Sequence, residues 1–124
     1  MISNFRVLGA GVWGLAFSDY LLKLGHNVEI FCRDTNLSNK DLTGLKLSHI
    51  SDNNIKSLDT LNTQKSNDEI NIIAVNSKGF SELLNKHKSY FSTLNALVSL
   101  TKGLDHLSGK YFSDYVFDMF SNIK

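Results

Sequence analysis

The stretch Gly9-Ala10-Gly11-Val12-Trp13-Gly14 decides the fold class of this 124-residue chain. It follows Phe5–Leu8, a short run with the apolar character of a buried strand. From Trp13 onward the apolar residues recur with a helical period, and we expect the helix to end at Gly25 in a left-handed cap. The stripe expected to face the core consists of Phe17, Tyr20, Leu21 and Leu24.

A second strand, Asn27–Cys32, completes a strand–turn–helix–strand unit within about 30 residues. Gly9 allows the tight turn out of the first strand, Gly11 lets a pyrophosphate approach the backbone, and Gly14 lets the helix pack closely. The helix N-terminus adds unpaired N–H groups and a positive dipole end. The unit therefore predicts a dinucleotide site, and its context disfavours the alternative of a glycine-rich turn without a ligand.

Two residues after the second strand compete for the adenosine ribose of that dinucleotide. Asp34 lies 20 positions after Gly14, where a carboxylate that accepts a hydrogen bond from the 2′-hydroxyl would favour NAD. Arg33 would instead pair with the 2′-phosphate of NADP. A third alternative is that both side chains lie in a solvated loop. The sequence therefore leaves the choice between NAD and NADP open.

The rest of the chain alternates strands with helices, after a polar segment, Asp34–Asn67, that we expect to be a loop region with one short helix near Leu58. The expected strands are Ile70–Val75 and Ala96–Leu100, and the expected helices are Ser77–Tyr90 and Ser108–Phe120. The apolar faces of the two helices are predicted to consist of Phe80, Leu83 and Leu84, and of Tyr111, Phe112, Tyr115, Val116, Met119 and Phe120. This order predicts one Rossmann-type, doubly wound α/β domain over residues 1–124, with a mainly parallel sheet.

The composition limits the classes of partner. Hydrophobic residues make up 42% of the chain, enough for a packed core, and the net charge of +1 gives no reason to expect nucleic acid or an anionic membrane as a partner. We expect no signal peptide and no membrane span. The single cysteine, Cys32, fits a reducing, cytoplasmic setting, and the four histidines show no metal-ligand spacing, so no metal site is predicted.

Several segments together resemble the start of one known family, the bacterial NAD(P)-dependent glycerol-3-phosphate dehydrogenases. They occur in the family's order and spacing: Gly9–Gly14, Gly25–Ile30, Arg33-Asp34, Leu42–Leu47, Ile73–Ser77 and Thr101-Lys102-Gly103-Leu104. The last of these is the most specific. Prolines that the family carries in the loop at Leu42–Leu47, and at the position of Asn76, are replaced here.

The resemblance implies an activity and a set of site residues. Members of the family reduce dihydroxyacetone phosphate to sn-glycerol 3-phosphate, a glycerophospholipid precursor, with NADPH or NADH. In the family the residues that match Val12, Trp13 and Arg33 contact the cofactor, and the one that matches Lys102 contacts both cofactor and substrate. A lysine at the carboxyl end of a parallel strand faces the ligand crevice, where its ammonium can hold a phosphate.

The chain departs from the family in length, because it ends at Lys124. The family's second glycine-rich segment, and the helical substrate domain with its catalytic lysine, have no counterpart in these residues. We therefore expect an incomplete sheet, a truncated chain that is inactive alone, and no catalytic residue within it. A phosphorylated substrate would bind only together with the helical domain.

Two alternatives remain open at this point. One is a stand-alone nucleotide-binding or interaction module that self-associates through an exposed sheet edge. The other is a fragment of a different Rossmann dehydrogenase, such as a ketopantoate reductase, although Thr101-Lys102-Gly103 argues against that choice.

Overall fold

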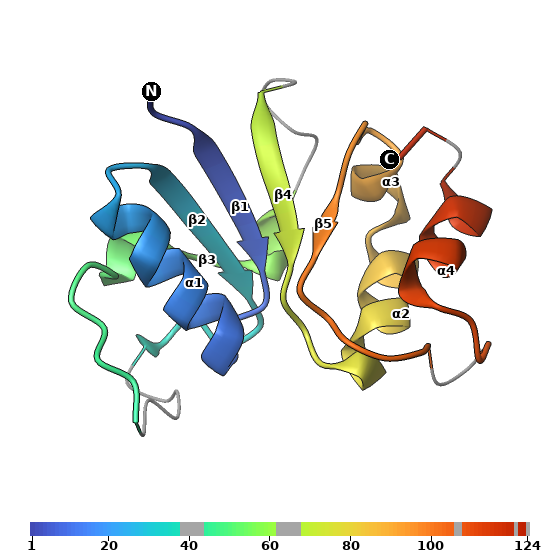
Figure 1. Ribbon diagram of the computed structural model, residues 1–124, viewed down its shortest axis with the longest axis horizontal. Helices are drawn as coiled ribbons and strands as arrows, with labels where there is room; N and C mark the ends of the chain where they lie inside the picture. The colour runs from blue at the N-terminus through green and yellow to red at the C-terminus, as the bar shows by residue number, and fades with distance from the viewer. Residues whose placement is uncertain (38–43, 62–67, 106–107, 121, 124) are drawn as a thin grey trace.

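A computed structural model describes residues 1–37, 44–61, 68–105, 108–120 and 122–123 of the chain. Its centre is a five-stranded sheet in the order β3-β2-β1-β4-β5, in which neighbouring strands are parallel (Figure 1). The strands are β1 (Asn4–Leu8), β2 (Asn27–Cys32), β3 (Ile55–Ser57), β4 (Glu69–Ile73) and β5 (Val98–Ser99). The helices are α1 (Val12–Lys23), α2 (Ser77–Lys86), α3 (Lys88–Phe91) and α4 (Phe112–Met119), with 3-10 turns η2 (Asp52–Asn54) and η3 (Leu58–Thr60).

Helices cover both faces of the sheet, which confirms the predicted Rossmann-type α/β fold (Figure 1). Successive residues of a strand point to opposite faces, so Val7 and Leu8 of β1 enter different core clusters and both are fully buried. Val7 packs in the cluster that contains Leu15 and Leu21 of α1. Leu8 packs in the cluster formed by α2, α3 and α4. This burial on two sides explains the consecutive apolar residues Val7-Leu8 of β1 and Ile72-Ile73 of β4.

The apolar stripe predicted for α1 was wrong at two of its four positions. Tyr20 and Leu24 are 55% and 54% exposed, whereas Leu21 is buried. The helix is rotated because Gly14 must face the sheet: a Cβ there would lie 2.5 Å from the carbonyl oxygen of Gly9. At about 100° per residue, residue 20 lies roughly 120° from residue 14 around the helix, and so points away from the sheet.

The C-terminus of α1 behaves as the sequence predicts. Gly25 has a φ of +90° and its N–H donates to the carbonyl oxygen of Leu22. The N–H of His26 donates to the carbonyl oxygen of Leu21. These two bonds form a Schellman motif, which satisfies the last carbonyls of the helix and turns the chain into β2.

Three other predicted elements need correction at their ends. The helix expected over 77–90 is broken at His87, whose φ of −116° is not helical, into α2 and α3. The strand expected over 96–100 pairs with β4 only at Val98 and Ser99. The last helix begins at Phe112 rather than at Ser108, so Tyr111 precedes it and is 67% exposed instead of buried.

The polar segment between β2 and β4 contains more structure than expected. The helical turn predicted near Leu58 is present as η3, but the strand β3 and the turn η2 were not anticipated. A strand of three residues is too short to show an alternation of polar and apolar side chains. Residues 38–43 and 62–67, which include Leu42 and Thr43 of the family-like loop, lie outside the described residues.

Candidate functional site: a dinucleotide-binding cavity at the glycine turn

In the glycine turn, a Cβ would collide with neighbouring backbone at Gly9 and Gly14 but would have free space at Gly11. Gly9 has a φ of +119°, and a Cβ there would lie 2.6 Å from the carbonyl oxygen of Ala74. A Cβ on Gly14 would meet the carbonyl oxygen of Gly9. Around Gly11, by contrast, no described atom other than those of Gly11 and its two chain neighbours lies within 4 Å of where a Cβ would be. Packing therefore requires glycine at the first and last positions, while the middle position is free for a ligand to approach the backbone.

The N-terminus of α1 is chemically ready for an anion. Gly11 is its N-cap, and within the described part of the chain no side chain caps this end. The first turn of α1 contains no acidic residue. The N–H groups and the positive end of the helix dipole are therefore available to a phosphate.

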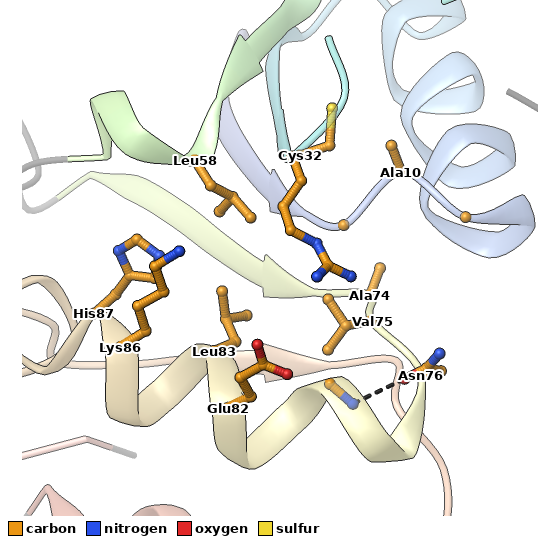
Figure 2. Close-up of a pocket in the computed structure, with 14 residues that line it drawn as sticks. Ala10, Cys32, Leu58, Ala74, Val75, Asn76, Glu82, Leu83, Lys86 and His87 are labelled. Atoms are coloured by element: carbon orange, nitrogen blue, oxygen red, sulfur yellow. Dashed lines mark hydrogen bonds between the residues drawn. The ribbon is translucent and has the colours of Figure 1, made fainter. Parts of the chain in front are cut away.

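A cavity of about 340 Å³ opens next to the turn, at the carboxyl ends of β1, β2 and β4 (Figure 2). Its lining includes residues at the ends of these three strands: Gly9–Gly11 after β1, Cys32 and Arg33 at the end of β2, and Ala74–Asn76 after β4. The carboxyl ends of parallel strands are where open α/β sheets bind ligands, and this volume lies within the usual range of small-molecule sites. The residues present thus fit the pyrophosphate and adenosine parts of a dinucleotide.

The structure separates the two candidates for the adenosine ribose. Arg33 and Asp34 are both exposed, but Arg33 lines the cavity and Asp34 is not among its lining residues. The Asp34 side chain accepts a hydrogen bond of 2.9 Å from the N–H of Asn36, and its carbonyl oxygen accepts one from the Cys32 thiol. Asp34 thus organises the loop after β2.

Trp13 and Lys102, which are 89 positions apart in the sequence, are brought together on the surface beside the turn. The Lys102 ammonium nitrogen lies 5.6 Å from the centroid of the Trp13 ring, a cation–π geometry. Trp13 is 70% exposed and Val12 52% exposed, so neither is a core residue. Both Trp13 and Lys102 are outside the 340 Å³ cavity but close to the N-terminus of α1.

Polar side chains form hydrogen bonds that fix the segments after β4 and β5 beside the glycine turn. The hydroxyl of Thr101 donates a hydrogen bond of 2.7 Å to the carbonyl oxygen of Val75, which joins the segments after β5 and β4. Asn76 caps α2 by accepting a hydrogen bond of 2.8 Å from the N–H of Gly79 (Figure 2). Asn76 therefore starts the following helix.

One wall of the cavity was missed by the sequence analysis. Besides Gly79 and Leu83, the α2 residues Glu82 and Lys86 line it, as does His87 at the helix end (Figure 2). Burial lowers the pKa of His87, and the neighbouring Lys86 lowers it further, while Asp59 opposes the change. The positions 79, 82 and 86 share one helix face, so their spacing after a strand end was the available signal.

The described residues contain neither a cluster of metal-ligating side chains nor a helix that could span a membrane. No group of three or more His, Cys, Asp or Glu side chains lies together there in an arrangement that could hold a metal ion. In the same part of the chain no helix has the length and apolar character to cross a bilayer.

Comparisons with known proteins agree with this geometry. A family model described as the N-terminus of NAD-dependent glycerol-3-phosphate dehydrogenase matches residues 4–124. A curated glycerol-3-phosphate dehydrogenase (NAD(P)+) from Thermoanaerobacter sp. is 30% identical over 123 residues, which are 96% of this chain and 37% of that protein. One from Rickettsia bellii is 31% identical over 124 residues, 96% of this chain and 39% of that protein.

The match concerns only one part of these relatives. A third relative of the same name, from Brachyspira hyodysenteriae, is 30% identical over 90% of this chain and 34% of its own length. The chain thus spans less than two fifths of each of these three proteins. The family match confirms the resemblance to the glycerol-3-phosphate dehydrogenases and decides against a fragment of a different Rossmann dehydrogenase. The chain belongs to the NAD-dependent glycerol-3-phosphate dehydrogenase family and corresponds to its N-terminal, dinucleotide-binding domain.

Proposed function

We propose that this chain binds NADPH or NADH with the pyrophosphate against Gly9–Gly14, and presents it for the reduction of dihydroxyacetone phosphate. The observation that carries the proposal is the open space at Gly11, beside the uncapped N-terminus of α1 and the 340 Å³ cavity. The substrate follows from the names of the relatives, which are glycerol-3-phosphate dehydrogenases. When bound, the dinucleotide supplies the hydride, and this chain binds and orients it.

Lys102 is the residue we assign to both cofactor and substrate. It follows β5, and the contact with Trp13 holds its ammonium beside the N-terminus of α1. A positive charge there stabilises a phosphate group, or the oxygen of a carbonyl that gains negative charge. Reduction also requires the carbonyl to be held and shielded from water. We therefore assign the reaction to the longer protein of the family, and cofactor binding to these residues.

Arg33 is the residue we assign to the adenosine end, because it lines the cavity whereas Asp34 does not. Arginine pairs well with a phosphate, so this assignment favours NADPH over NADH. Asp34 remains the alternative, because its carboxylate would favour NADH.

Titration calorimetry on the 124-residue chain tests both assignments. We expect wild type to bind NADPH more tightly than NADH, and Arg33→Gln to lose most of that difference. Asp34→Asn serves as the matched variant on the neighbouring residue and should leave the ratio of the two affinities unchanged. If Arg33→Gln weakens both dinucleotides equally while Asp34→Asn removes discrimination, the assignment passes to Asp34. If wild type binds neither at millimolar concentration, the binding proposal fails.

A second candidate role is self-association, which the exposed side of β5 favours. β5 is the last strand in the order formed by the described residues, and Val98 on it is 46% exposed. A groove of about 250 Å³ beside it is lined mostly by apolar side chains, including Phe117, which is 55% exposed. Sedimentation velocity over a range of concentrations tests this role. A dimer that Val98→Lys dissociates would support it, and a monomer at all concentrations would exclude it.

A further inference from the structure

The wall of the cavity formed by α2 carries charges that nothing in the sequence comparison assigns. Lys86 lies in the last turn of α2 and Glu82 one turn before it, and both line the cavity (Figure 2). Figure 2 shows Lys86 and His87 at one end of the cavity and Ala10 of the glycine turn at the other. Leu58 of η3 lies across the cavity from Lys86 and His87, and these three residues form what we call the far end of the cavity.

The direction in which a dinucleotide crosses the cavity follows from the turn. With the pyrophosphate at Gly9–Gly11, the adenosine must extend past the end of β2, where Arg33 lines the same cavity. The far end, with Leu58, Lys86 and His87, then surrounds the adenosine and its ribose. Lys86 is thus a second cation, on another element, that lines the same cavity as Arg33.

The balance of charge at this end decides what it accepts. Lys86 and Arg33 are positive and Glu82 is negative, while burial and the neighbouring Lys86 lower the pKa of His87, which favours its neutral imidazole. A 2′-phosphate carries up to two negative charges, so the two cations favour it and the carboxylate of Glu82 opposes it. A bare 2′-hydroxyl has no charge and gains little from either cation.

We propose that Lys86 is a specificity-determining residue that, with Arg33, binds the 2′-phosphate of NADP, and that Glu82 limits this preference. The proposal rests on the dinucleotide binding put forward above. A structural role for Lys86 also exists, because a lysine in the last turn of a helix interacts favourably with the helix dipole. That role would change the stability of the fold but not the ratio of the affinities for NADPH and NADH.

The test is calorimetric titration of NADPH and NADH into the 124-residue chain at fixed low salt. We expect Lys86→Gln to weaken NADPH about tenfold and NADH less than about twofold. Glu82→Gln should strengthen NADPH about threefold and leave NADH unchanged. Lys86→Arg, which keeps the charge, should retain the preference and covers the case in which Lys86→Gln does not fold.

The matched control is Lys78→Gln, because Lys78 is an exposed lysine of the same helix that does not line the cavity. It should change neither affinity. An equal effect of Lys86→Gln on both dinucleotides, no effect at all, or the same selective effect from Lys78→Gln would overturn the proposal. Failure of wild type to bind either dinucleotide would instead overturn the underlying binding function, and this inference with it.

Discussion

The ammonium nitrogen of Lys102 lies 5.6 Å from the centroid of the Trp13 ring, so the segment after β5 meets the first turn of α1. An exposed cation–π contact contributes only about 0.5–1 kcal/mol, so its loss does not threaten the fold. The contact therefore matters for where it places the charge. It connects the most specific family-like segment, Thr101-Lys102-Gly103-Leu104, with the glycine turn.

Replacing Lys102 with Met should weaken NADH and NADPH by a similar factor, roughly three- to tenfold, because the lost charge lies away from the adenosine end. It should also change the emission of Trp13, the single tryptophan of the chain, before any dinucleotide is added. Fluorescence spectra and fluorescence titrations measure both effects. Lys23→Met, at the opposite end of α1, is the control. Unchanged emission and affinity in Lys102→Met would contradict the placement of this lysine.

Gly14→Ala should destabilise the fold by about 3 kcal/mol or more. The new methyl would lie 2.5 Å from the carbonyl oxygen of Gly9, a backbone atom that cannot move aside like a flexible side chain. Urea denaturation followed by circular dichroism measures the free energy of unfolding. Gly109→Ala is a useful comparison, because it has a positive φ of +69° but open space around a Cβ. Gly109→Ala should lower the free energy of unfolding clearly less than Gly14→Ala does. Equal losses in the two variants would show that close packing is not the reason for glycine at position 14.

Asp19 should make the stability of the chain depend on pH in the acidic range. Burial acts to raise the pKa of Asp19, but hydrogen bonds from the N–H groups of Ser48, His49 and Ile50 outweigh it and lower the pKa below its ordinary value. A lowered pKa in the folded state means that the charged form stabilises the fold above about pH 4. This contribution is lost as the pH falls from about 4 through the folded-state pKa.

The corresponding measurement compares wild type with Asp19→Ala by urea denaturation at pH 7 and pH 3. At pH 7 the variant should be less stable by about 2 kcal/mol, because three backbone N–H groups lose a charged acceptor. At pH 3 the difference should shrink. Asp68→Ala, at an exposed position, should show no such dependence. A difference that stays constant between the two pH values would contradict the role of the Asp19 carboxylate.

Arg6 should be more important for stability than its place in a short strand indicates. It is 3% exposed, and its Nε lies 3.0 Å from a carboxylate oxygen of Glu69 and 3.5 Å from one of Glu29. Its guanidinium also donates to the hydroxyl of Tyr90 on α3, which in turn donates to Asn71. Arg6→Met should cost about 3–5 kcal/mol, because Glu69 stays buried without its arginine.

The double variant Arg6→Met, Glu69→Met separates the loss of the ion pair itself from the penalty of leaving Glu69 buried without its partner. It removes the buried pair as a unit, so most of the lost stability should return. Chemical denaturation of the wild type, both single variants and the double variant gives the coupling between the two residues. Additive losses would show that the two charges do not stabilise the fold together.

The fold was predictable because the decisive features are local. Gly9, Gly11 and Gly14 act within one turn, and the strand segments that are buried on both faces, such as Val7-Leu8 and Ile72-Ile73, are apolar. The orientation of α1 was not predictable from its apolar residues. It depends on a close contact between Gly14 and Gly9, which turns Ser18 toward the sheet and leaves Tyr20 exposed.

The position of Arg33 beside the cavity was predictable because it directly follows a strand. The role of Lys102, which comes from the specific segment Thr101-Lys102-Gly103-Leu104, stays a prediction. Glu82 and Lys86 were missed because an exposed charge on a helix is usually solvated, and only the position of α2 against the strand ends makes these residues line a cavity. The folded loop at Ser48–Ile50 was missed for a related reason. Its anchor, Asp19, is about 30 residues earlier in the sequence.

The measurement that tests the central claim most directly is calorimetric titration of NADPH and NADH into Gly11→Ala beside wild type. No described atom beyond this residue and its two chain neighbours lies within 4 Å of the new methyl, and the φ of Gly11 is −76°, so the free energy of unfolding should fall by less than about 1 kcal/mol. The methyl would occupy the space assigned to the pyrophosphate, so the affinity for both dinucleotides should fall at least tenfold. A variant that folds normally and binds both dinucleotides as tightly as wild type would contradict the account.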